Sequence, residues 1–167
     1  WERPYWDDEG GEKGEQMVAD VQASDALLLG RTTYDIWRPY WPYQSDDIAK
    51  AFNRVPKYVA SRTLRGPLTW NATLLEGDLV DSVRNLKAKH HGDLIVTGAG
   101  ELARSLVTQN LVDEFWFTVC PYLWPAGPRV FDGLSAIPLD LVATRTFPGG
   151  VVQLCYRPSS AGTRQNG

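Results

Sequence analysis

The sequence predicts an α/β domain built on a mixed, mostly parallel sheet with an antiparallel hairpin at its C-terminal edge. The first two-thirds of the chain alternate helical and strand-like stretches, which is typical of parallel strands joined by helices. Residues 25–29 form a short apolar run stopped by Gly30, as expected of a buried strand, and residues 93–97 form the clearest parallel-type strand. Near the C-terminus, two strand-like stretches are joined by Pro148-Gly149-Gly150, which favours a hairpin.

Each element is predicted by a local pattern. Two helices are expected to begin at an aspartate N-cap, one at Asp46 or Asp47 and the other at Asp78. The oxygen of a short side chain can accept hydrogen bonds from the free N–H groups of the first turn. Gly30 is expected to end the first strand. Helices are predicted at about 15–23, 32–37, 46–53 and 79–90 and again after Gly100, and strands at 25–29, 57–60, 72–75, 93–97, 114–119, 139–147 and 151–157.

Length and charge limit the organisation of the chain and its partners. The 167 residues suit one domain, which we place at residues 1–158, followed by a polar C-terminal tail at 159–167. A net charge of −3 argues against nucleic acid as a partner, since binding to phosphate backbones needs a basic face. No apolar run approaches the ~20 residues of a membrane-spanning helix, and no signal-peptide pattern is present. We therefore expect a cytoplasmic protein with no membrane partner.

The cysteines and histidines do not indicate a metal site. Cys120 and Cys155 lie in strand-like stretches without metal-ligand spacing, so two reduced thiols are favoured over a disulfide. The only histidines are the adjacent pair His90 and His91, and we expect no bound metal.

Three short turns carry the residues that indicate chemistry. Gly30-Arg31-Thr32-Thr33, Ser61-Arg62-Thr63 and Gly98-Ala99-Gly100-Glu101 each follow a predicted strand. Because ligands of open α/β sheets bind beyond the carboxyl ends of the parallel strands, we expect the three turns to meet on one rim. Each turn by itself is also compatible with an ordinary strand-to-helix connection or a helix cap.

The chemistry of these turns suits a dinucleotide that carries an extra phosphate. Glycine lets the backbone approach a pyrophosphate, and a helix N-terminus offers free N–H groups to it. Hydroxyl donors come from Thr32, Thr33, Ser61 and Thr63. Arg31 and Arg62 add planar, permanently charged forks for a 2′-phosphate, which favours NADPH over NADH.

The order and spacing of these stretches resemble the dihydrofolate reductase-like superfamily. The chain is more closely similar to the reductase domain of bifunctional riboflavin-biosynthesis deaminase-reductases and to its stand-alone bacterial relatives. The resemblance lies in residues 26–34, 57–64 and 94–102, continues into 111–115 and 121–131, and extends to about Arg157. The family usually has consecutive glycines in the third turn, where this chain has Ala99 between Gly98 and Gly100.

The resemblance implies a three-layer αβα fold, NADPH binding and hydride transfer to a small heterocycle that is pteridine- or pyrimidine-like, as in dihydrofolate reductase or 5-amino-6-(5-phosphoribosylamino)uracil reductase. It also implies a homodimer. The turn at 98–102 would hold the pyrophosphate, while Arg31, Ser61 and Arg62 would face the 2′-phosphate. The implied cofactor contacts are Gly30, Arg31, Thr32, Thr33, Ser61, Arg62, Thr63, Thr97, Gly98, Ala99, Gly100, Glu101 and Leu102.

The substrate half of the site is less defined by the sequence. Trp6, Tyr34, Trp37 and Tyr122 are candidates to line a cavity for a flat heterocycle, with core packing as the alternative for Trp37. We assign no catalytic acid: Asp7, Asp8, Glu9, Glu12, Glu15 and Asp20 lie near the expected region, but a solvated acidic loop and helix face is favoured over a catalytic role for any one of them. The alternative function is a non-catalytic nucleotide-binding or sensor module on the same fold.

Overall fold

The computed structural model describes residues 11–98, 100–123, 125–127 and 129–160. The chain divides into two compact units. One comprises Gly14–Leu111, and the other comprises Trp1–Lys13 together with Val112–Gly167. Each unit is described by itself below, and the single domain predicted at 1–158 stays a prediction.

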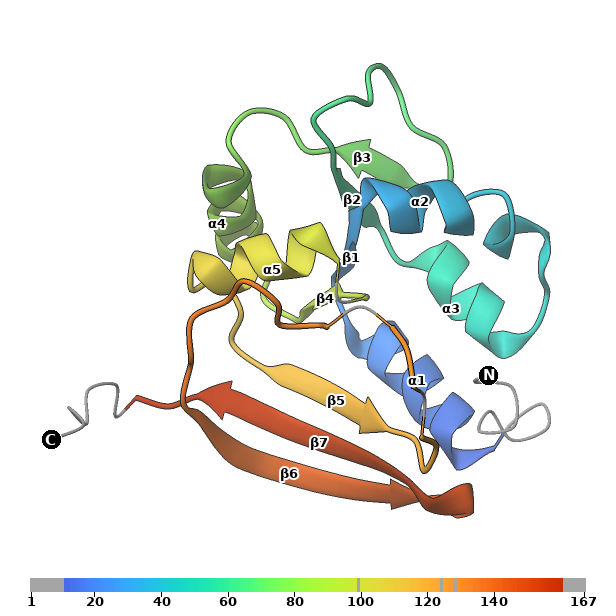
Figure 1. Cartoon of the computed structure of the whole chain (residues 1–167). Helices are drawn as coiled ribbons and strands as arrows, with labels where there is room; N and C mark the ends of the chain where they lie inside the picture. The colour runs from blue at the N-terminus through green and yellow to red at the C-terminus, as the bar shows by residue number, and fades with distance from the viewer. Residues whose placement is uncertain (1–10, 99, 124, 128, 161–167) are drawn as a thin grey trace, which may run out of the picture. The chain divides into compact units, whose positions relative to one another are not determined.

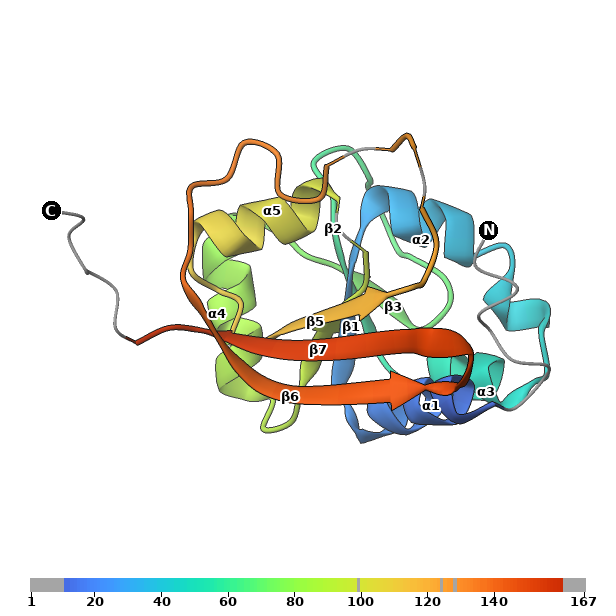
Figure 2. The same cartoon turned by 60° about the horizontal axis from the view of Figure 1, so that its bottom comes forward.

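The Gly14–Leu111 unit is built on a four-stranded parallel sheet with the strand order β3-β2-β1-β4. Its helices lie on both faces of the sheet, with α2 and α3 on one side and α4 and α5 on the other (Figure 1 and Figure 2). The predicted three-layer αβα arrangement is confirmed. The elements are α1 (Glu12–Ala23), β1 (Ala26–Gly30), α2 (Arg31–Trp37), the short 3₁₀ helix η2 (Trp41–Tyr43), α3 (Asp47–Arg54), β2 (Lys57–Ala60), β3 (Ala72–Leu74), α4 (Leu79–Lys89), β4 (Leu94–Val96) and α5 (Glu101–Thr108).

Strand β1 forms the centre of the core. Its four residues before Gly30 are at most 2% exposed, because β2 and β4 flank the strand and helices cover both of its faces. Leu27 and Leu29 point to the same side, as alternate strand residues must. On that side they join a cluster with Val21 of α1, Phe52 of α3 and Val59 of β2. The core therefore fixes β1 firmly beneath the turn that begins at Gly30.

The second unit contains a three-stranded antiparallel sheet with the order β5-β7-β6. Its strands are β5 (Phe115–Val119), β6 (Leu139–Phe147) and β7 (Val151–Pro158). The short 3₁₀ helix η3 (Pro148–Gly150) joins β6 to β7, with Gly149 and Gly150 at φ of 75° and 79°, a backbone region that favours glycine. The predicted hairpin is confirmed. The antiparallel strands form a sheet of their own, where the sequence predicted one mixed sheet.

Both cysteines are free thiols. In the part of the chain that the structure describes, every helix is too short or too polar to cross a membrane. The cytoplasmic location and the homodimer stay predictions.

Aspartates start two of the helices, as the sequence predicts. The carboxylate of Asp46 accepts from the backbone N–H of Ala49 at 2.7 Å. The carboxylate of Asp78 accepts from the N–H groups of Val80 and Asp81 at 2.9 and 3.1 Å. These bonds satisfy donors that the first turn of a helix otherwise leaves without a partner.

We expect Asp78→Ala to lower the free energy of unfolding by about 1 kcal/mol, because two first-turn donors lose their acceptor. The matched control is Asp81→Ala in the same turn. Its carboxylate only pairs with Arg84 at 3.9 Å on the exposed surface, and its removal should change stability by at most about 0.5 kcal/mol. Urea denaturation of the three proteins measures both effects, and equal losses would contradict the capping role.

A buried lysine lies at the start of β2. Lys57 is 1% exposed. Its Nζ lies 4.2 Å from the centroid of the Trp70 ring and donates to the backbone oxygen of Asn53 at 3.4 Å. Neither partner carries a formal charge. Burial therefore lowers the pKa of Lys57 from 10.5 to about 8, because the charged amine loses its hydration.

The free energy of unfolding should therefore rise with pH between about 8 and 10.5, where the unfolded chain holds a proton on Lys57 that the folded chain has lost. Lys57→Met keeps the apolar stem and removes the titrating amine. It should flatten the rise by up to about 3 kcal/mol, since one pKa unit corresponds to about 1.4 kcal/mol. Urea denaturation of both proteins at the two ends of this range measures the difference, and parallel pH curves would contradict it.

Candidate functional site

The register of the parallel sheet brings the three predicted turns to one edge. Gly30 of β1 pairs with Ala60 of β2, so the turns that follow these strands begin at the same level. On the other side of β1, Leu28 pairs with Val96 of β4, so Gly98 follows this pair by two residues after β4, as Gly30 does on β1. The sheet thus forms a rim from the first residues after β1, β2 and β4.

Direct contacts join the turns of this rim. Arg31 donates from Nη1 to Oγ1 of Thr63, which links the first turn to the second. A Cβ on Gly30 would lie 3.6 Å from Cβ of Leu102, and a Cβ on Gly98 would lie 4.0 Å from Oγ1 of Thr33, so the first turn also approaches the third. The structure therefore brings the predicted cofactor residues of the three turns together, except Ala99, which lies outside the described residues.

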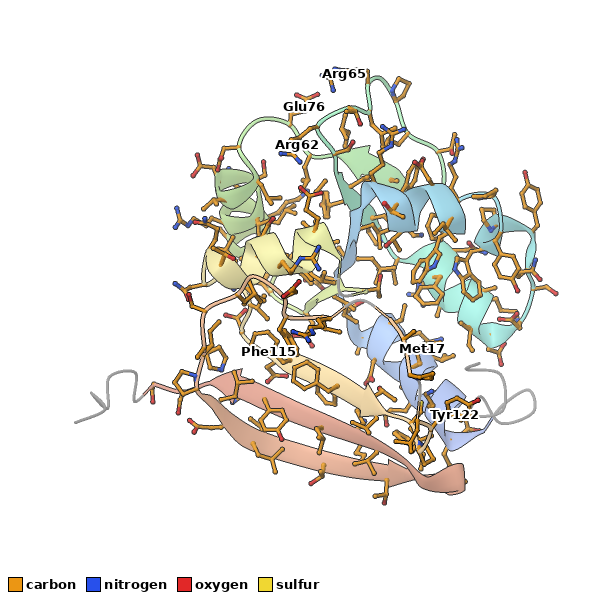
Figure 3. The ribbon with its side chains drawn as sticks, in the orientation of Figure 1. Met17, Arg62, Arg65, Glu76, Phe115 and Tyr122 are labelled. Atoms are coloured by element: carbon orange, nitrogen blue, oxygen red, sulfur yellow. The ribbon has the colours of Figure 1, made fainter. Side chains whose placement is uncertain are left out.

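The second turn is held by its own hydrogen bonds. Oγ of Ser61 accepts from the backbone N–H groups of Thr63 and Leu64 at 3.2 and 3.1 Å. Nη1 of Arg65 donates to the backbone oxygens of Arg62 and Leu64 at 3.0 and 2.7 Å. The backbone that carries Arg62 is thereby fixed, while the guanidinium of Arg62 extends from it into the rim (Figure 3).

Both arginines predicted to bind phosphate already face a carboxylate. Nε of Arg31 lies 3.1 Å from Oδ2 of Asp35, one helical turn further along α2. Nη2 of Arg62 lies 2.7 Å from Oε1 of Glu101, the first residue of α5. The side chains of Arg62 and Glu101 are 87% and 76% exposed, so this ion pair contributes at most about 1 kcal/mol. An anionic ligand could exchange with the carboxylate at little cost.

The helices that begin at the rim differ from those capped by aspartate. Gly30 and Gly100 occupy the N-cap positions of α2 and α5, and neither residue has a side chain that could accept from the first turn. The backbone of Gly98 has a φ of 89°, a conformation that favours glycine. First-turn N–H groups and a close backbone approach are the features that suit an anion such as a pyrophosphate.

The hydroxyl oxygen of Thr97 is a buried polar atom at the third turn. Its Oγ1 is buried and makes no hydrogen bond with the residues that the structure describes. Buried hydroxyl groups in proteins are almost always bonded. Thr97 directly precedes Gly98, so its hydroxyl lies at the base of the third turn.

The predicted substrate-lining residues do not gather at the rim in the same way. Tyr34 is 2% exposed, and its hydroxyl bonds with the backbone N–H and oxygen of Thr69, both at 3.1 Å. Trp37 packs against Phe52 with ring centroids 4.8 Å apart, which is the packing alternative left open for it. Tyr122 is 54% exposed in the second unit, and Trp6 lies outside the described residues. A substrate contact for these four side chains stays a prediction.

The described acidic residues near the N-terminus do not indicate a proton donor. Glu12 and Glu15 are exposed, and Asp20 accepts from Nε2 of Gln16 at 2.6 Å on the same helix. Asp7, Asp8 and Glu9 lie outside the described residues. Among the residues that are described, no group of three or more His, Cys, Asp or Glu side chains is arranged to hold a metal ion.

Sequence reasoning missed two residues of the rim. Asp35 is four residues after Arg31 on a helix, a spacing that brings opposite charges together and could have indicated the pair. Arg65 carries no such signal, because its bonds depend on the irregular path of the loop.

Comparison with known proteins identifies the family. The helix-flanked parallel sheet followed by an antiparallel sheet is the dihydrofolate reductase-like fold. Residues 4–153 match the RibD C-terminal domain family, and the chain therefore belongs to that family.

Individual relatives agree with this membership. The uncharacterized protein YyaP of Bacillus subtilis (strain 168) is 32% identical over 138 residues, covering 79% of this chain and 73% of that protein. A candidate riboflavin biosynthesis protein from Shewanella sp. PV-4 superposes with a TM-score of 0.69 at 26% identity, covering 85% and 78% of the two chains. A diaminohydroxyphosphoribosylaminopyrimidine deaminase/5-amino-6-(5-phosphoribosylamino)uracil reductase from Thermotoga maritima superposes with a TM-score of 0.63 at 16% identity, which shows the fold alone. This chain covers 48% of that structure.

Gly98 and Gly100 offer a matched pair of substitutions in the third turn. Gly98→Ala should lower the free energy of unfolding by about 1–2 kcal/mol, because an alanine is strained at a φ of 89°. Gly100→Ala should cost less, at most about 1 kcal/mol for the poorer N-cap, since Gly100 has a φ of −82° and a Cβ there meets nothing within 4 Å. Thermal or urea denaturation measures both, and a larger loss for Gly100→Ala would contradict this geometry.

Proposed function

We propose that this protein is an NADPH-dependent reductase that transfers a hydride to a small heterocycle, pyrimidine- or pteridine-like. The observation that carries the proposal is the rim itself, where two arginines and two glycine-started helices meet at the carboxyl edge of one parallel sheet. This is the edge at which open α/β sheets bind nucleotides. Membership of the RibD C-terminal domain family supports the same activity.

The residues of the rim fit the parts of the cofactor. The backbone from Gly98 to Leu102 suits the pyrophosphate, because Gly98 and Gly100 leave the N–H groups accessible. Arg31, Ser61 and Arg62 suit the adenosine 2′-phosphate, which guanidinium groups bind as a fork. The hydroxyl of Thr97, which has no hydrogen-bond partner among the described residues, would gain one. When bound, the nicotinamide supplies the hydride, and the protein's task is to orient it and to exclude water.

The class of substrate is supported less directly. The Thermotoga maritima relative is named as a reductase of 5-amino-6-(5-phosphoribosylamino)uracil, and the sequence resemblance implies a flat heterocycle of this kind. We assign no residue to donate a proton, since Glu12 and Glu15 are exposed and Asp20 already accepts a hydrogen bond from Gln16. The proposed reaction relies on positioning of cofactor against substrate.

The alternative is a non-catalytic nucleotide-binding or sensor module. It is favoured by the absence of an assigned acid and by Ala99 in the turn where the family usually has consecutive glycines. The two functions share the cofactor site and differ in turnover. Oxidation of NADPH with any member of a panel of pyrimidine and pteridine substrates would exclude the non-catalytic module.

Binding of the cofactor tests the proposal directly. Titration followed by the fluorescence of the reduced nicotinamide should give saturable binding of NADPH, and no binding at millimolar cofactor would refute the proposed function. Arg62→Ala should weaken NADPH by about 10- to 100-fold, since hydrogen bonds between charged groups contribute about 1.5–3 kcal/mol. It should weaken NADH by less than about threefold, because NADH lacks the phosphate that Arg62 would bind.

The matched control for this prediction is Arg84→Ala. It removes an exposed guanidinium from α4 that lies 3.9 Å from Asp81. Both cofactors should bind this variant as they bind the original protein. Equal losses of NADPH and NADH in Arg62→Ala would refute the 2′-phosphate assignment while leaving a nucleotide site intact.

A further inference from the structure

The ion pair between Arg62 and Glu101 joins two separate parts of the rim. Arg62 lies in the turn after β2, and Glu101 is the first residue of α5, 39 positions further along the chain. Their Nη2 and Oε1 atoms lie 2.7 Å apart, and both side chains are largely exposed. Glu101 is therefore bonded to the guanidinium of Arg62, the group that the proposed function assigns to binding the 2′-phosphate.

We propose that Glu101 is a specificity-determining residue that competes with the 2′-phosphate for Arg62 and so sets the ratio of NADPH to NADH affinity. The inference rests on the proposed function, because it takes Arg62 to be the phosphate ligand. It assigns the two members of one ion pair opposite effects. Arg62 favours the phosphorylated cofactor, and Glu101 favours the unphosphorylated one.

Charge supports the first half of this assignment. While the carboxylate of Glu101 is hydrogen-bonded to the guanidinium of Arg62, a 2′-phosphate can bind Arg62 only by approaching this like charge or by displacing it. Like charges at this distance repel, and the phosphate is the stronger acceptor for a guanidinium fork. Displacement is feasible because Glu101 is 76% exposed, so its carboxylate can turn into solvent without losing a buried partner.

Hydrogen bonding supports the second half. NADH carries a 2′-hydroxyl where NADPH carries the phosphate, and a hydroxyl can donate to a carboxylate. In that complex the ion pair stays intact and Glu101 gains a bond. A site that attracts one ligand and repels the other through neighbouring residues uses both means of achieving specificity.

The other arginine of the rim is held differently. Arg31 pairs with Asp35 on its own helix at 3.1 Å and also donates to Thr63. The side chains of Arg31 and Asp35 are 49% and 43% exposed, so both are more enclosed than the Arg62–Glu101 pair. The exchangeable carboxylate of the rim is therefore that of Glu101.

The test is to titrate NADPH and NADH into the original protein, Glu101→Gln and Asp81→Asn. We expect Glu101→Gln to raise the ratio of NADPH to NADH affinity about tenfold, equivalent to 1.4 kcal/mol. The gain should shrink with added salt, because the interaction is between exposed charges. Asp81→Asn removes the same charge from the first turn of α4, where it pairs with Arg84, and should leave the ratio unchanged.

Glu101→Asp keeps the charge and shortens the side chain by one methylene, so it should give an intermediate ratio. An unchanged ratio in Glu101→Gln, with both cofactors bound by the original protein, overturns this inference and leaves the proposed function standing. Weaker NADPH binding in Glu101→Gln also overturns it, since Glu101 would then position Arg62 rather than compete. If the original protein binds neither cofactor, the proposed function fails and the inference fails with it.

Discussion

The parallel pairing of β1 with β2 and β4 is the constraint on which the candidate site depends. It pairs Gly30 with Ala60 on one side and Leu28 with Val96 on the other, so that three turns far apart in sequence start at the same edge of the sheet. A slip of one residue in either pairing would turn the buried leucines of β1 away from their cluster. The core that buries Leu27 and Leu29 therefore also sets the geometry of the rim.

The backbone of the rim is held more firmly than the side chains that extend from it. The segment between β2 and β3 is tied by Ser61 at the rim, by the hydroxyl of Tyr34 at Thr69, and by Trp70, whose Nε1 donates to Asn53 at 2.6 Å. Trp70 has a φ of 66°, which is unfavourable for a bulky residue and persists only because its surroundings hold it. Because these three sets of hydrogen bonds hold the backbone of the segment, the exposed guanidinium of Arg62 can exchange partners without a change in the fold.

The sequence predicted most of what depends on local pattern and on topology. The caps at Asp46 and Asp78 follow from short-range hydrogen bonding, and the meeting of the three turns follows from parallel strands. The pairing of Arg62 with Glu101 could not be predicted, because it depends on rotamers of side chains 39 residues apart. The sequence also did not indicate that Tyr34 lies in the core, where its hydroxyl bonds to Thr69 of the neighbouring loop, and a substrate contact for Tyr34 stays a prediction.

The balance of charge at the rim gives the site its selectivity in the proposed function. Without neighbouring carboxylates, Arg31 and Arg62 would attract any phosphate, since a guanidinium recognises a phosphate only by its charge and by its pair of parallel N–H donors. Asp35 and Glu101 place a carboxylate at each of them and reduce that general attraction. A single phosphate would then gain little affinity. A ligand that contacts all three turns would bind more tightly, because it would also reach the first turns of the two helices that begin after glycine and the buried hydroxyl of Thr97. In the proposed function, a dinucleotide is favoured over a simple anion because several individually weak contacts must be made together.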